Sequence, residues 1–348
     1  MSHKTNTPVL KGKDGDCGLM PMSPATPYRV IPDVTFEREV VMDIKNEYLI
    51  NGEAHSVYLY GFTDPANGGE KSFPSPVIRV RQGQTVHTHL VASHIHTIHH
   101  HGIEPSTHND GVGHYSFDVQ GAYSYQWYAS QSGTYFYHCH VNTVLHAEMG
   151  MYGALIIDPP SGPGTVEGDG IGNFLPYDVE AIWAVDELDS HWRKQGEHAA
   201  LCGGDAGLNK LEPDIFVING IANDNTVIQK GGVSVTVNAD TAPGVAVNAR
   251  VGDRILIRYI QAGYFPQKIH FPSGLGKVKV IAEDGRPLAQ AEILPVENGF
   301  SVDLMTPAER KEFYLVPKTQ GVYRVSMEIQ HWITREVVGS VSTLITVN

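Results

Sequence analysis

Short runs of β-branched and aromatic residues recur through the first half of the chain, each only a few positions long. Clusters of Pro, Asn and Gly separate the runs, and this spacing is typical of the short strands of a β-sandwich or barrel. The pattern therefore predicts an all-β fold. The expected strands lie at residues 40–44, 57–62, 77–81, 85–92, 124–129, 134–141 and 153–158.

The length of the chain and its turn-forming segments divide it into two domains. At 348 residues the chain is long enough for two hydrophobic cores. A Pro- and Gly-rich stretch at residues 159–164 ends the first strand-rich region and is typical of a linker. We expect an N-terminal arm over residues 1–35, a first domain over residues 36–160, and a linker followed by a second domain over residues 161–348.

The second half of the chain repeats the first weakly. The segment at residues 80–86 precedes the first-half histidines and is echoed at residues 249–255, and the Gly-x-Tyr at 133–135 is echoed at 321–323. Two echoes in the same order indicate a duplicated β-sandwich. Between the halves, residues 187–200 are expected to form an exposed helix before strand patterns resume.

Composition narrows the possible functions. The formal net charge of −13 argues against nucleic acid or an anionic membrane surface as a partner. No apolar stretch reaches the roughly 18 residues that a membrane-spanning helix needs, and the first residues lack the apolar core of a signal peptide. We therefore expect a cytoplasmic protein, or an exported one whose signal has been removed, that acts on small molecules, metals or proteins.

Histidine and cysteine supply the candidate chemistry. Twelve of the 18 histidines fall between residues 87 and 146. The three cysteines are too few for a dense disulfide framework, and their odd number leaves at least one thiol unpaired. Cys17 and Cys202 could form a disulfide, and Cys139 lies within the histidine-rich segment.

Two H-x-H pairs in that segment predict a metal site. His99 and His101 form one pair, and His138 and His140 form the other. Residues at i and i+2 of a strand project from the same face, so each strand offers two imidazoles to one side. Four converging imidazoles suit copper or zinc. Cys139, which lies inside the second pair, must face the opposite side.

Ligands for a second metal are present on the Cys139 side of these strands. His96 lies at odd spacing from the first H-x-H pair, His146 follows the cysteine by seven residues, and Met149 and Met151 both offer a thioether. Two imidazoles, a thiolate and a distant thioether are the ligands of a blue-copper electron-transfer site, whereas zinc more often takes further cysteines or a water. The pattern therefore favours copper.

Four motifs resemble those of the multicopper oxidase and copper nitrite reductase superfamily. They are T-I-H-H-H-G at 97–102, D-G-V at 110–112, G-T-Y-F-Y-H-C-H at 133–140 and M-Y-G-A-L-I-I at 151–157. The resemblance extends over about residues 40–348, and it implies two cupredoxin-like Greek-key β-sandwich domains.

The resemblance also implies the copper ligands. In the family a cysteine, two histidines and a methionine hold a type 1 copper, which implies His96, Cys139, His146 and Met151 here. The H-x-H pairs form the first-domain half of a trinuclear copper cluster, which implies His99, His101, His138 and His140. A type 1 site in the first of two domains is similar to nitrite reductases and to two-domain laccase-like oxidases. Those proteins are homotrimers whose second metal centre lies between domain 1 of one subunit and domain 2 of the next.

The second half departs from the family pattern. The family's oxidases supply four more histidines there, and at most His270 is kept. The spacing from Gly252 matches His270 to the family's first histidine of a pair, whereas an ungapped comparison of the two halves from Gly83 matches it to His101. Glu328 stands where nitrite reductases have a histidine ligand, and His331 is out of register by one. We expect an inter-domain site of one or two ions, held by the four first-domain histidines with His270 and with Glu328 or His331.

The resemblance implies a copper-dependent oxidoreductase of the laccase-like, multicopper oxidase type. A small-molecule or metal-ion reductant would deliver electrons at the type 1 copper, and dioxygen would be reduced at the inter-domain centre. Asp110 and Glu328 are the candidate catalytic proton donors. A copper nitrite reductase and an electron-transfer protein without a complete cluster are the alternatives. Five further histidines are expected to support the site or to lie at the surface: His87, His89, His94, His108 and His114.

Overall fold

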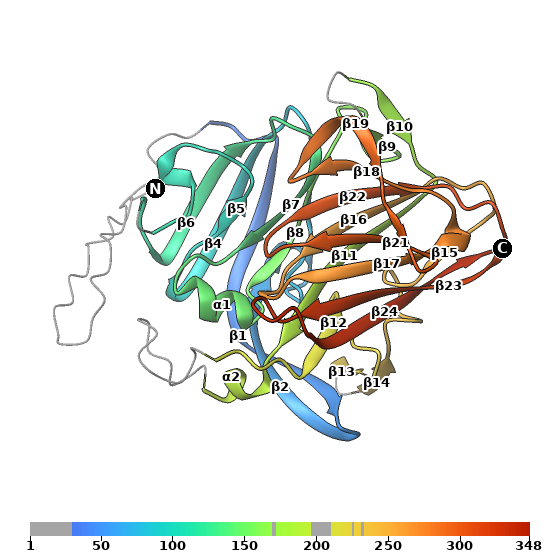
Figure 1. Ribbon diagram of the computed structural model, residues 1–348. Helices are drawn as coiled ribbons and strands as arrows, with labels where there is room; N and C mark the ends of the chain where they lie inside the picture. Colours follow the sequence, from blue (N-terminus) through green and yellow to red (C-terminus); the bar gives the residue numbers. More distant parts are fainter. Residues whose placement is uncertain (1–29, 114, 169–171, 196–209, 225, 231–232) are drawn as a thin grey trace.

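The computed structural model describes residues 30–113, 115–168, 172–195, 210–224, 226–230 and 233–348. Strands dominate these residues, and two short α-helices accompany them (Figure 1). The predicted all-β fold is confirmed. Every strand expected in the first half lies within an observed strand or overlaps one.

The elements follow one another along the chain in two similar sets. The strands of the first half are β1 (Val34–Ile50), β2 (Glu53–Thr63), β3 (Ile78–Arg81), β4 (Thr85–His96), β5 (His99–His101), β6 (Val119–Tyr128), β7 (Gly133–His138) and β8 (Tyr152–Asp158). The connecting segment carries β9 (Thr165–Glu167) and β10 (Phe174–Pro176). The later strands are β11 (Val179–Leu188), β12 (Ile215–Ile218), β13 (Thr226–Lys230), β14 (Val233–Val237), β15 (Val247–Ala249), β16 (Ile255–Gln261), β17 (Gln267–Pro272), β18 (Val278–Glu283), β19 (Arg286–Ile293), β20 (Val296–Glu297), β21 (Phe300–Met305), β22 (Arg310–Leu315), β23 (Gly321–Gln330) and β24 (Val337–Val347). The helices are α1 (Thr143–Glu148) and α2 (Ser190–Gln195), with single 3-10 turns at Pro65–Asn67, Thr107–Asn109 and Ser273–Leu275.

Two sheets form the first sandwich. One has the order β14-β13-β1-β4-β6 with β2 also paired to β1, and the other has the order β3-β8-β7-β5. In the second of these sheets β5 and β7 run antiparallel, and His99 lies opposite His138. This pairing brings the two predicted H-x-H motifs onto neighbouring strands. The β13–β14 hairpin comes from the second half of the chain and joins the first sandwich by pairing with β1.

The second sandwich is built from two sheets of six strands each. Their orders are β12-β11-β16-β22-β18-β19 and β15-β24-β23-β17-β21-β20. A shared apolar core that includes Trp183 and Phe313 lies between them. Side chains alternate across each strand, so β17 buries Ile269 and Phe271 and leaves His270 half-buried on the outer side of its sheet.

The two sandwiches share their strand connectivity, as expected of a duplication. β1 pairs in parallel with β4 and β3 with β8, while β11 pairs in parallel with β16 and β15 with β24. The glycines that begin the equivalent strands β7 and β23 define a common register. His138 and Ser326 each lie five residues after the glycine of their own strand. His138 pairs with His99, and Ser326 pairs with His270. His270 is therefore the structural counterpart of His99 and not of His101.

The segment predicted as one exposed helix at residues 187–200 is different in the structure. Its first residues belong to β11, and within the described residues α2 spans Ser190–Gln195 with Trp192 and Arg193 buried. The helix starts where it does because the Asp189 carboxylate accepts hydrogen bonds from the backbone N–H groups of the first turn. The polar residues of this stretch suggested exposure, whereas contacts with β2 and α1 bury one side of the helix. Residues 196–209 lie outside the described part of the chain.

A buried polar network joins the two sandwiches. Arg258 on β16 donates to Glu312 over 2.5 Å, to Glu180 over 2.6 Å and to Thr134 over 3.2 Å. Thr134 belongs to β7 of the first sandwich and itself donates to Glu312 over 2.7 Å. Since buried charges are costly unless they are paired, this network holds the two sandwiches in one relative position.

Helices of the described residues are all too short or too polar to cross a membrane. Cys17, Cys202 and His114 lie outside the described residues, so the possible Cys17–Cys202 disulfide stays a prediction.

Candidate metal centres

Cys139 meets its two predicted histidine partners in the core of the first sandwich. Cys139 follows β7 directly, His96 ends β4, and His146 lies in α1. All three side chains are buried. The chain turns into α1 through Asn142, whose φ of 42° lies in the left-handed region that asparagine tolerates better than most residues. This turn brings His146 back over the cysteine.

The spacing of these three side chains fits one small metal ion. The Sγ atom of Cys139 lies 3.5 Å from Nδ1 of His96 and 3.3 Å from Nδ1 of His146. Ligand atoms bound at about 2.0–2.3 Å to one ion lie roughly 3.3–3.8 Å apart, depending on the bond angle. A thiolate with two imidazoles suits copper or zinc, and the hard cations Mg²⁺ and Ca²⁺ would require oxygen ligands instead.

Backbone hydrogen bonds hold Met151 next to this group. The N–H of Cys139 donates to the carbonyl of Met151 over 3.0 Å, and the N–H of Met151 donates to the carbonyl of His146 over 3.0 Å. The Met151 side chain is fully buried, as is that of Met149. The N–H of Tyr60 donates to the Met149 carbonyl, which fixes that part of the loop on β2. The backbone therefore keeps Met151 beside Cys139, and both side chains belong to the same apolar core.

Burial sets the protonation states in this group. It lowers the pKa of His96 to about 3, with a smaller contribution from His146, and it lowers the pKa of His146 to about 4. Burial raises the pKa of the Cys139 thiol to about 11. The imidazoles are thus neutral at physiological pH, which is the form that binds metals, and the thiol keeps its proton until a metal displaces it.

A second histidine group lies on the other side of β5 and β7. Nδ1 of His101 is 3.2 Å from Nε2 of His138, and His99 belongs to the same group, with one nitrogen of each ring within 4.8 Å of the others. The ring of His140 lies 5.5 Å from that of His99 and 5.8 Å from that of His138. The structure therefore brings all four histidines of the two H-x-H pairs together.

Neighbouring oxygens orient three of these rings. Nδ1 of His99 lies 2.8 Å from the carbonyl of Asp110, and Nδ1 of His138 lies 2.9 Å from the carbonyl of Cys139. Nδ1 of His140 lies 3.2 Å from Oγ1 of Thr143. These contacts direct Nε2 of each ring away from the oxygen partner, an arrangement typical of metal-binding histidines. The Asp110 carboxylate also lies 3.5 Å from His99, so Asp110 stands beside the group as expected.

Two histidines of the second group are also held neutral, those at positions 101 and 138. Burial lowers the pKa of His101 to about 3, and the nearby Arg310 of the second sandwich adds to this effect. Burial likewise lowers the pKa of His138 well below its ordinary range. Neutral imidazoles in a cluster leave their ring nitrogens available as ligands without loss of a proton.

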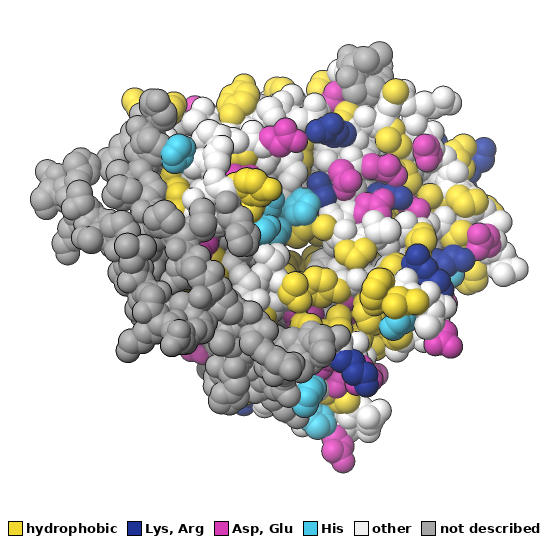
Figure 2. All heavy atoms as spheres, turned by 60° about the vertical axis from the view of Figure 1, so that its left-hand side comes forward, with side chains coloured by type: hydrophobic (Ala, Val, Ile, Leu, Met, Phe, Trp, Pro, Cys, Tyr) yellow, Lys and Arg dark blue, Asp and Glu magenta, His cyan; other side chains and the backbone are white. Residues whose placement is uncertain are grey.

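The second group reaches the surface, whereas the Cys139 group is enclosed. His99, His101 and His140 are half-buried. Figure 2 shows histidine side chains at the surface near the middle of the face drawn there, close to hydrophobic side chains. His94 and His108 are exposed away from the ligand positions. The open side of the second group leaves room for ligands from outside this sandwich.

His270 and Glu328 lie together on the second sandwich. Nε2 of His270 is 3.1 Å from Oε2 of Glu328, and the two residues belong to the neighbouring strands β17 and β23. Among the described residues, neither belongs to a group of three or more metal-binding side chains. His331 has a structural contact instead, since its Nδ1 accepts hydrogen bonds from the N–H groups of Ile333 and Thr334. One chain by itself therefore does not complete the predicted inter-domain site.

Two residues that the sequence analysis did not single out support both groups. The hydroxyl of Thr97 accepts a hydrogen bond from the N–H of His140 over 3.0 Å, and hydrogen bonds from Thr97 partly offset the effect of burial on the Cys139 thiol. His100 is fully buried, and its Nε2 lies 2.9 Å from Oγ1 of Thr88. Period-two alternation could have placed His100 on the inner side of β5, but its partner on β4 depends on the folded structure.

Comparisons with known proteins agree with this geometry. A multicopper oxidase family model matches residues 53–162, which include every first-domain ligand candidate. An L-ascorbate oxidase from Cucumis sativus is 28% identical over 158 residues, which are 42% of this chain and 24% of that protein. A copper resistance protein A homolog from Pseudomonas syringae pv. tomato is 40% identical over 98 residues, 26% of this chain and 16% of that protein. The chain thus aligns with about a quarter or less of the length of these relatives.

Solved structures share the fold over most of the chain. A blue copper oxidase from Nitrosomonas europaea superposes with a TM-score of 0.64 at 22% identity, covering 90% of this chain and 86% of that one. A copper nitrite reductase from the same organism superposes with a TM-score of 0.59 at 17% identity, covering 90% of this chain and 93% of that one. The resemblance to this superfamily and the predicted cupredoxin-like β-sandwich domains are confirmed.

Proposed function

We propose that this chain, which contains a multicopper oxidase domain, is a copper-dependent oxidoreductase with a type 1 copper at Cys139. The observation that carries the proposal is the enclosed group in which the thiol lies 3.5 Å and 3.3 Å from two neutral imidazoles, those of His96 and His146. Met151, whose backbone is hydrogen-bonded to Cys139 and His146, would supply a soft thioether to the copper. Copper bound by this set supplies one-electron transfer.

The main chain links this site with the second histidine group. Cys139 lies between His138 and His140, so its side chain is one peptide unit away from two proposed ligands of the second group. The carbonyl of Cys139 also lies 2.9 Å from Nδ1 of His138. Asp110, whose carboxylate lies beside His99, is the proposed proton donor for the acceptor reduced there.

We propose that the second copper centre forms between two copies of the chain. The four first-domain histidines would be joined by His270 and Glu328 of a neighbouring copy, in the homotrimer that the family resemblance implies. The open side of the histidine group and the position of His270 on the outer face of its sheet support this arrangement. Metal ions held there would act as Lewis acids toward dioxygen, with Glu328 as a further proton donor or ligand.

Copper analysis combined with oxygen uptake tests the proposal. Copper-loaded protein is expected to contain more than one copper ion per chain and to show the intense visible absorption of a blue-copper site. It is expected to consume dioxygen with a phenol or an oxidisable metal ion as the reductant. A fully loaded sample that shows no oxygen uptake with either class of reductant would contradict the oxidase.

Nitrite reduction is the second candidate, and one feature of the second sandwich favours it. Only His270 stands at the positions equivalent to the two H-x-H pairs, since Ser326 and Glu328 are the counterparts of His138 and His140. A ligand set with so few second-domain histidines suits a single type 2 copper better than a trinuclear cluster. Nitric oxide release from nitrite under anaerobic, reducing conditions would establish this activity.

A non-catalytic electron carrier is the third candidate. Among the described residues of one chain, His270 and Glu328 belong to no group with the first-domain histidines, and this arrangement favours the carrier. A single copper ion per chain in fully loaded protein, located at Cys139 by anomalous scattering, would support the carrier and exclude both enzymes.

A further inference from the structure

The helix that carries His146 is held at its start by a residue of the second sandwich. Tyr264 lies in the loop at residues 262–266, which connects β16 with β17. Its hydroxyl group donates to the carbonyl of Val144 over 2.8 Å and lies 3.2 Å from the carbonyl of Thr143. These two residues begin α1, and His146 follows in the same helix. A loop of one sandwich therefore contacts a helix of the other, next to a proposed copper ligand.

The position of α1 depends on contacts with the rest of the protein. The helix spans six residues, whereas isolated helices shorter than about 12–15 residues are marginal in water. Its end is also held from outside the first sandwich, because Arg193 of α2 donates to the carbonyl of Glu148. Both ends of the helix are thus tied to other parts of the chain, and the place of His146 within it depends on those contacts.

A buried carboxyl group fixes the loop that presents Tyr264. Oε1 of Glu187 accepts hydrogen bonds from the N–H groups of Tyr264 and Phe265, the second over 2.7 Å. Glu187 belongs to β11 and is fully buried. Gly263 allows this close approach, because a Cβ atom there would lie 2.0 Å from Oε2 of Glu187. The loop is therefore anchored on β11, and Tyr264 reaches α1 from a fixed base.

The first turn of α1 lies between the two histidine groups. Nδ1 of His146 is 3.3 Å from Sγ of Cys139. Oγ1 of Thr143 is 3.2 Å from Nδ1 of His140 in the other group. A displacement of this turn would therefore move a candidate ligand of the Cys139 group and release a contact that orients a ring of the second group.

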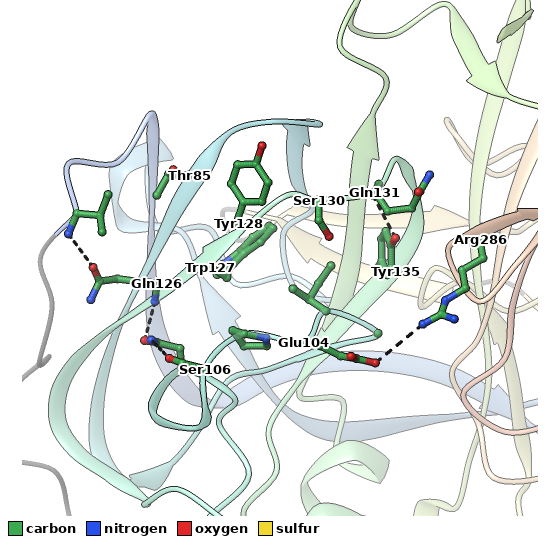
Figure 3. Close-up of a pocket in the computed structure, with 15 residues that line it drawn as sticks. Thr85, Glu104, Ser106, Gln126, Trp127, Tyr128, Ser130, Gln131, Tyr135 and Arg286 are labelled. Atoms are coloured by element: carbon green, nitrogen blue, oxygen red, sulfur yellow. Dashed lines mark hydrogen bonds and ion pairs between the residues drawn. The ribbon is translucent and has the colours of Figure 1, made fainter. Parts of the chain in front are cut away.

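A second tyrosine hydroxyl joins the sandwiches through partners outside α1. The hydroxyl of Tyr135 donates to the carbonyl of Gly285 in the second sandwich over 3.0 Å and to that of Gln131 over 3.1 Å. Tyr135 lines a pocket of about 710 Å³ beside Tyr128, where the sandwiches meet (Figure 3). None of the described residues that line this pocket belongs to α1. Tyr135 thus matches Tyr264 in its chemistry and differs from it in the element that it holds.

We propose that Tyr264 is a positioning residue for the type 1 copper and acts through α1 on His146. Its hydroxyl group holds the first turn of the helix, and this keeps the imidazole of His146 against the thiol of Cys139. The proposal rests on the proposed function for the identity of the metal, whereas the hold on α1 exists without copper. The second sandwich thereby controls a copper site whose candidate ligands all belong to the first.

Hydrogen exchange of the full, copper-free chain tests the hold on α1. Tyr264→Phe removes the hydroxyl group and keeps the ring. Exchange at the amide of His146, which donates to the carbonyl of Asn142, is expected to become about two- to tenfold faster. The reason is that the loss of one hydrogen bond makes local opening of the helix easier. Tyr135→Phe is the matched control and is expected to leave this amide unchanged.

Absorption spectra of copper-loaded protein test the effect on the metal site. Tyr264→Phe is expected to keep one copper ion at Cys139, while the position and relative intensity of the visible bands shift, because these bands depend on the geometry of the ligands. Tyr135→Phe is expected to show the wild-type bands. Equal shifts in the two variants would mean that loss of any hydrogen bond between the sandwiches is sufficient, and they would overturn the positioning role.

The two measurements separate this proposal from the proposed function. Faster exchange in α1 of Tyr264→Phe, with no blue-copper absorption in the loaded wild-type protein, would support the hold on α1 and contradict the type 1 copper. Unchanged exchange, or visible bands that are present in the wild type and identical in Tyr264→Phe, would overturn the positioning role and leave the proposed function intact.

Discussion

At the scale of single residues, copper binding at Cys139 is expected to release one proton at pH 7. The thiol, with its pKa raised to about 11, is protonated at that pH, whereas His96 and His146, with pKa values lowered to about 3 and 4, are already neutral. Between about pH 4 and pH 11 only the thiol proton is displaced, so copper affinity should rise about tenfold per pH unit. Calorimetric titration of copper-free protein in buffers of different ionisation enthalpies measures the proton count.

This measurement is best made on a variant whose second histidine group no longer binds metal. His99→Ala combined with His101→Ala serves that purpose, because these side chains lie on the opposite side of the strands from Cys139. Release of two or more protons at pH 7 would mean that the imidazoles are protonated before copper binds, contrary to the effect of their burial.

Replacement of the thiol is expected to remove one metal site and spare the other. Cys139→Ser should lose one copper ion per chain and the intense visible absorption, because a hydroxyl group does not supply the soft, charged sulfur ligand. Copper at the second histidine group should stay. Elemental analysis and absorption spectroscopy check both points, with the exposed His94→Ala as control. Persistence of the visible band in Cys139→Ser would contradict the type 1 assignment.

At the scale of elements, the contact between β7 and the strands β16 and β22 depends on one buried arginine. Arg258→Met should lower the free energy of unfolding by about 3–5 kcal/mol, because it leaves the buried Glu312 without its cation, whereas Glu180 keeps its ion pair with Arg79. Denaturant unfolding of the copper-free protein measures the change. Arg254→Met is the matched control, since Arg254 pairs with Asp178 at the surface and its loss should have a much smaller effect. Equal effects of the two substitutions would contradict the structural role of the network.

The elements themselves differ in how far the sequence predicted them. The strands of the first half were expected at their observed positions. A half-buried strand shows an alternation of apolar and polar residues that can be recognised in its own sequence. The helix predicted at residues 187–200 was wrong at its start and in its exposure. Polarity along that stretch reports on single residues, whereas the burial of Trp192 and Arg193 follows from packing of α2 against α1 and β2.

At the scale of the whole molecule, the proposed second copper centre requires association of chains. The outer face of the second sandwich carries exposed apolar side chains close to His270, including Phe300, whose ring lies 5.9 Å from it, and Leu304. Phe300→Asp is expected to convert a trimer into monomers, because it places a charge in an apolar contact. The copper of the second centre should be lost with it, and the visible absorption of the Cys139 site should stay.

Light scattering and copper analysis on the same samples check this prediction. Tyr58→Asp is the control, since Tyr58 is an exposed aromatic residue on β2 of the first sandwich. Wild-type protein that is monomeric and still holds copper at both centres would contradict an inter-subunit site.

The sequence by itself determined the all-β fold, the duplication and the division of the candidate first-domain ligands into two groups. These features are local. The two-residue period of a strand puts the side chains of His138 and His140 on one side and that of Cys139 on the other, regardless of which strand pairs with it. The observed contacts of His96 with Cys139, and of His101 with His138, follow that division.

Only the tertiary structure decided which distant segments meet. The register of β17 against β23 made His270 the counterpart of His99, and its contact with Glu328 lies apart from the first-domain histidines. The β13–β14 hairpin crosses to the first sandwich, and the pocket beside Tyr128 forms where the sandwiches meet. Such features depend on strand pairing and on contacts between residues far apart in the chain, and no local periodicity encodes which partners pair.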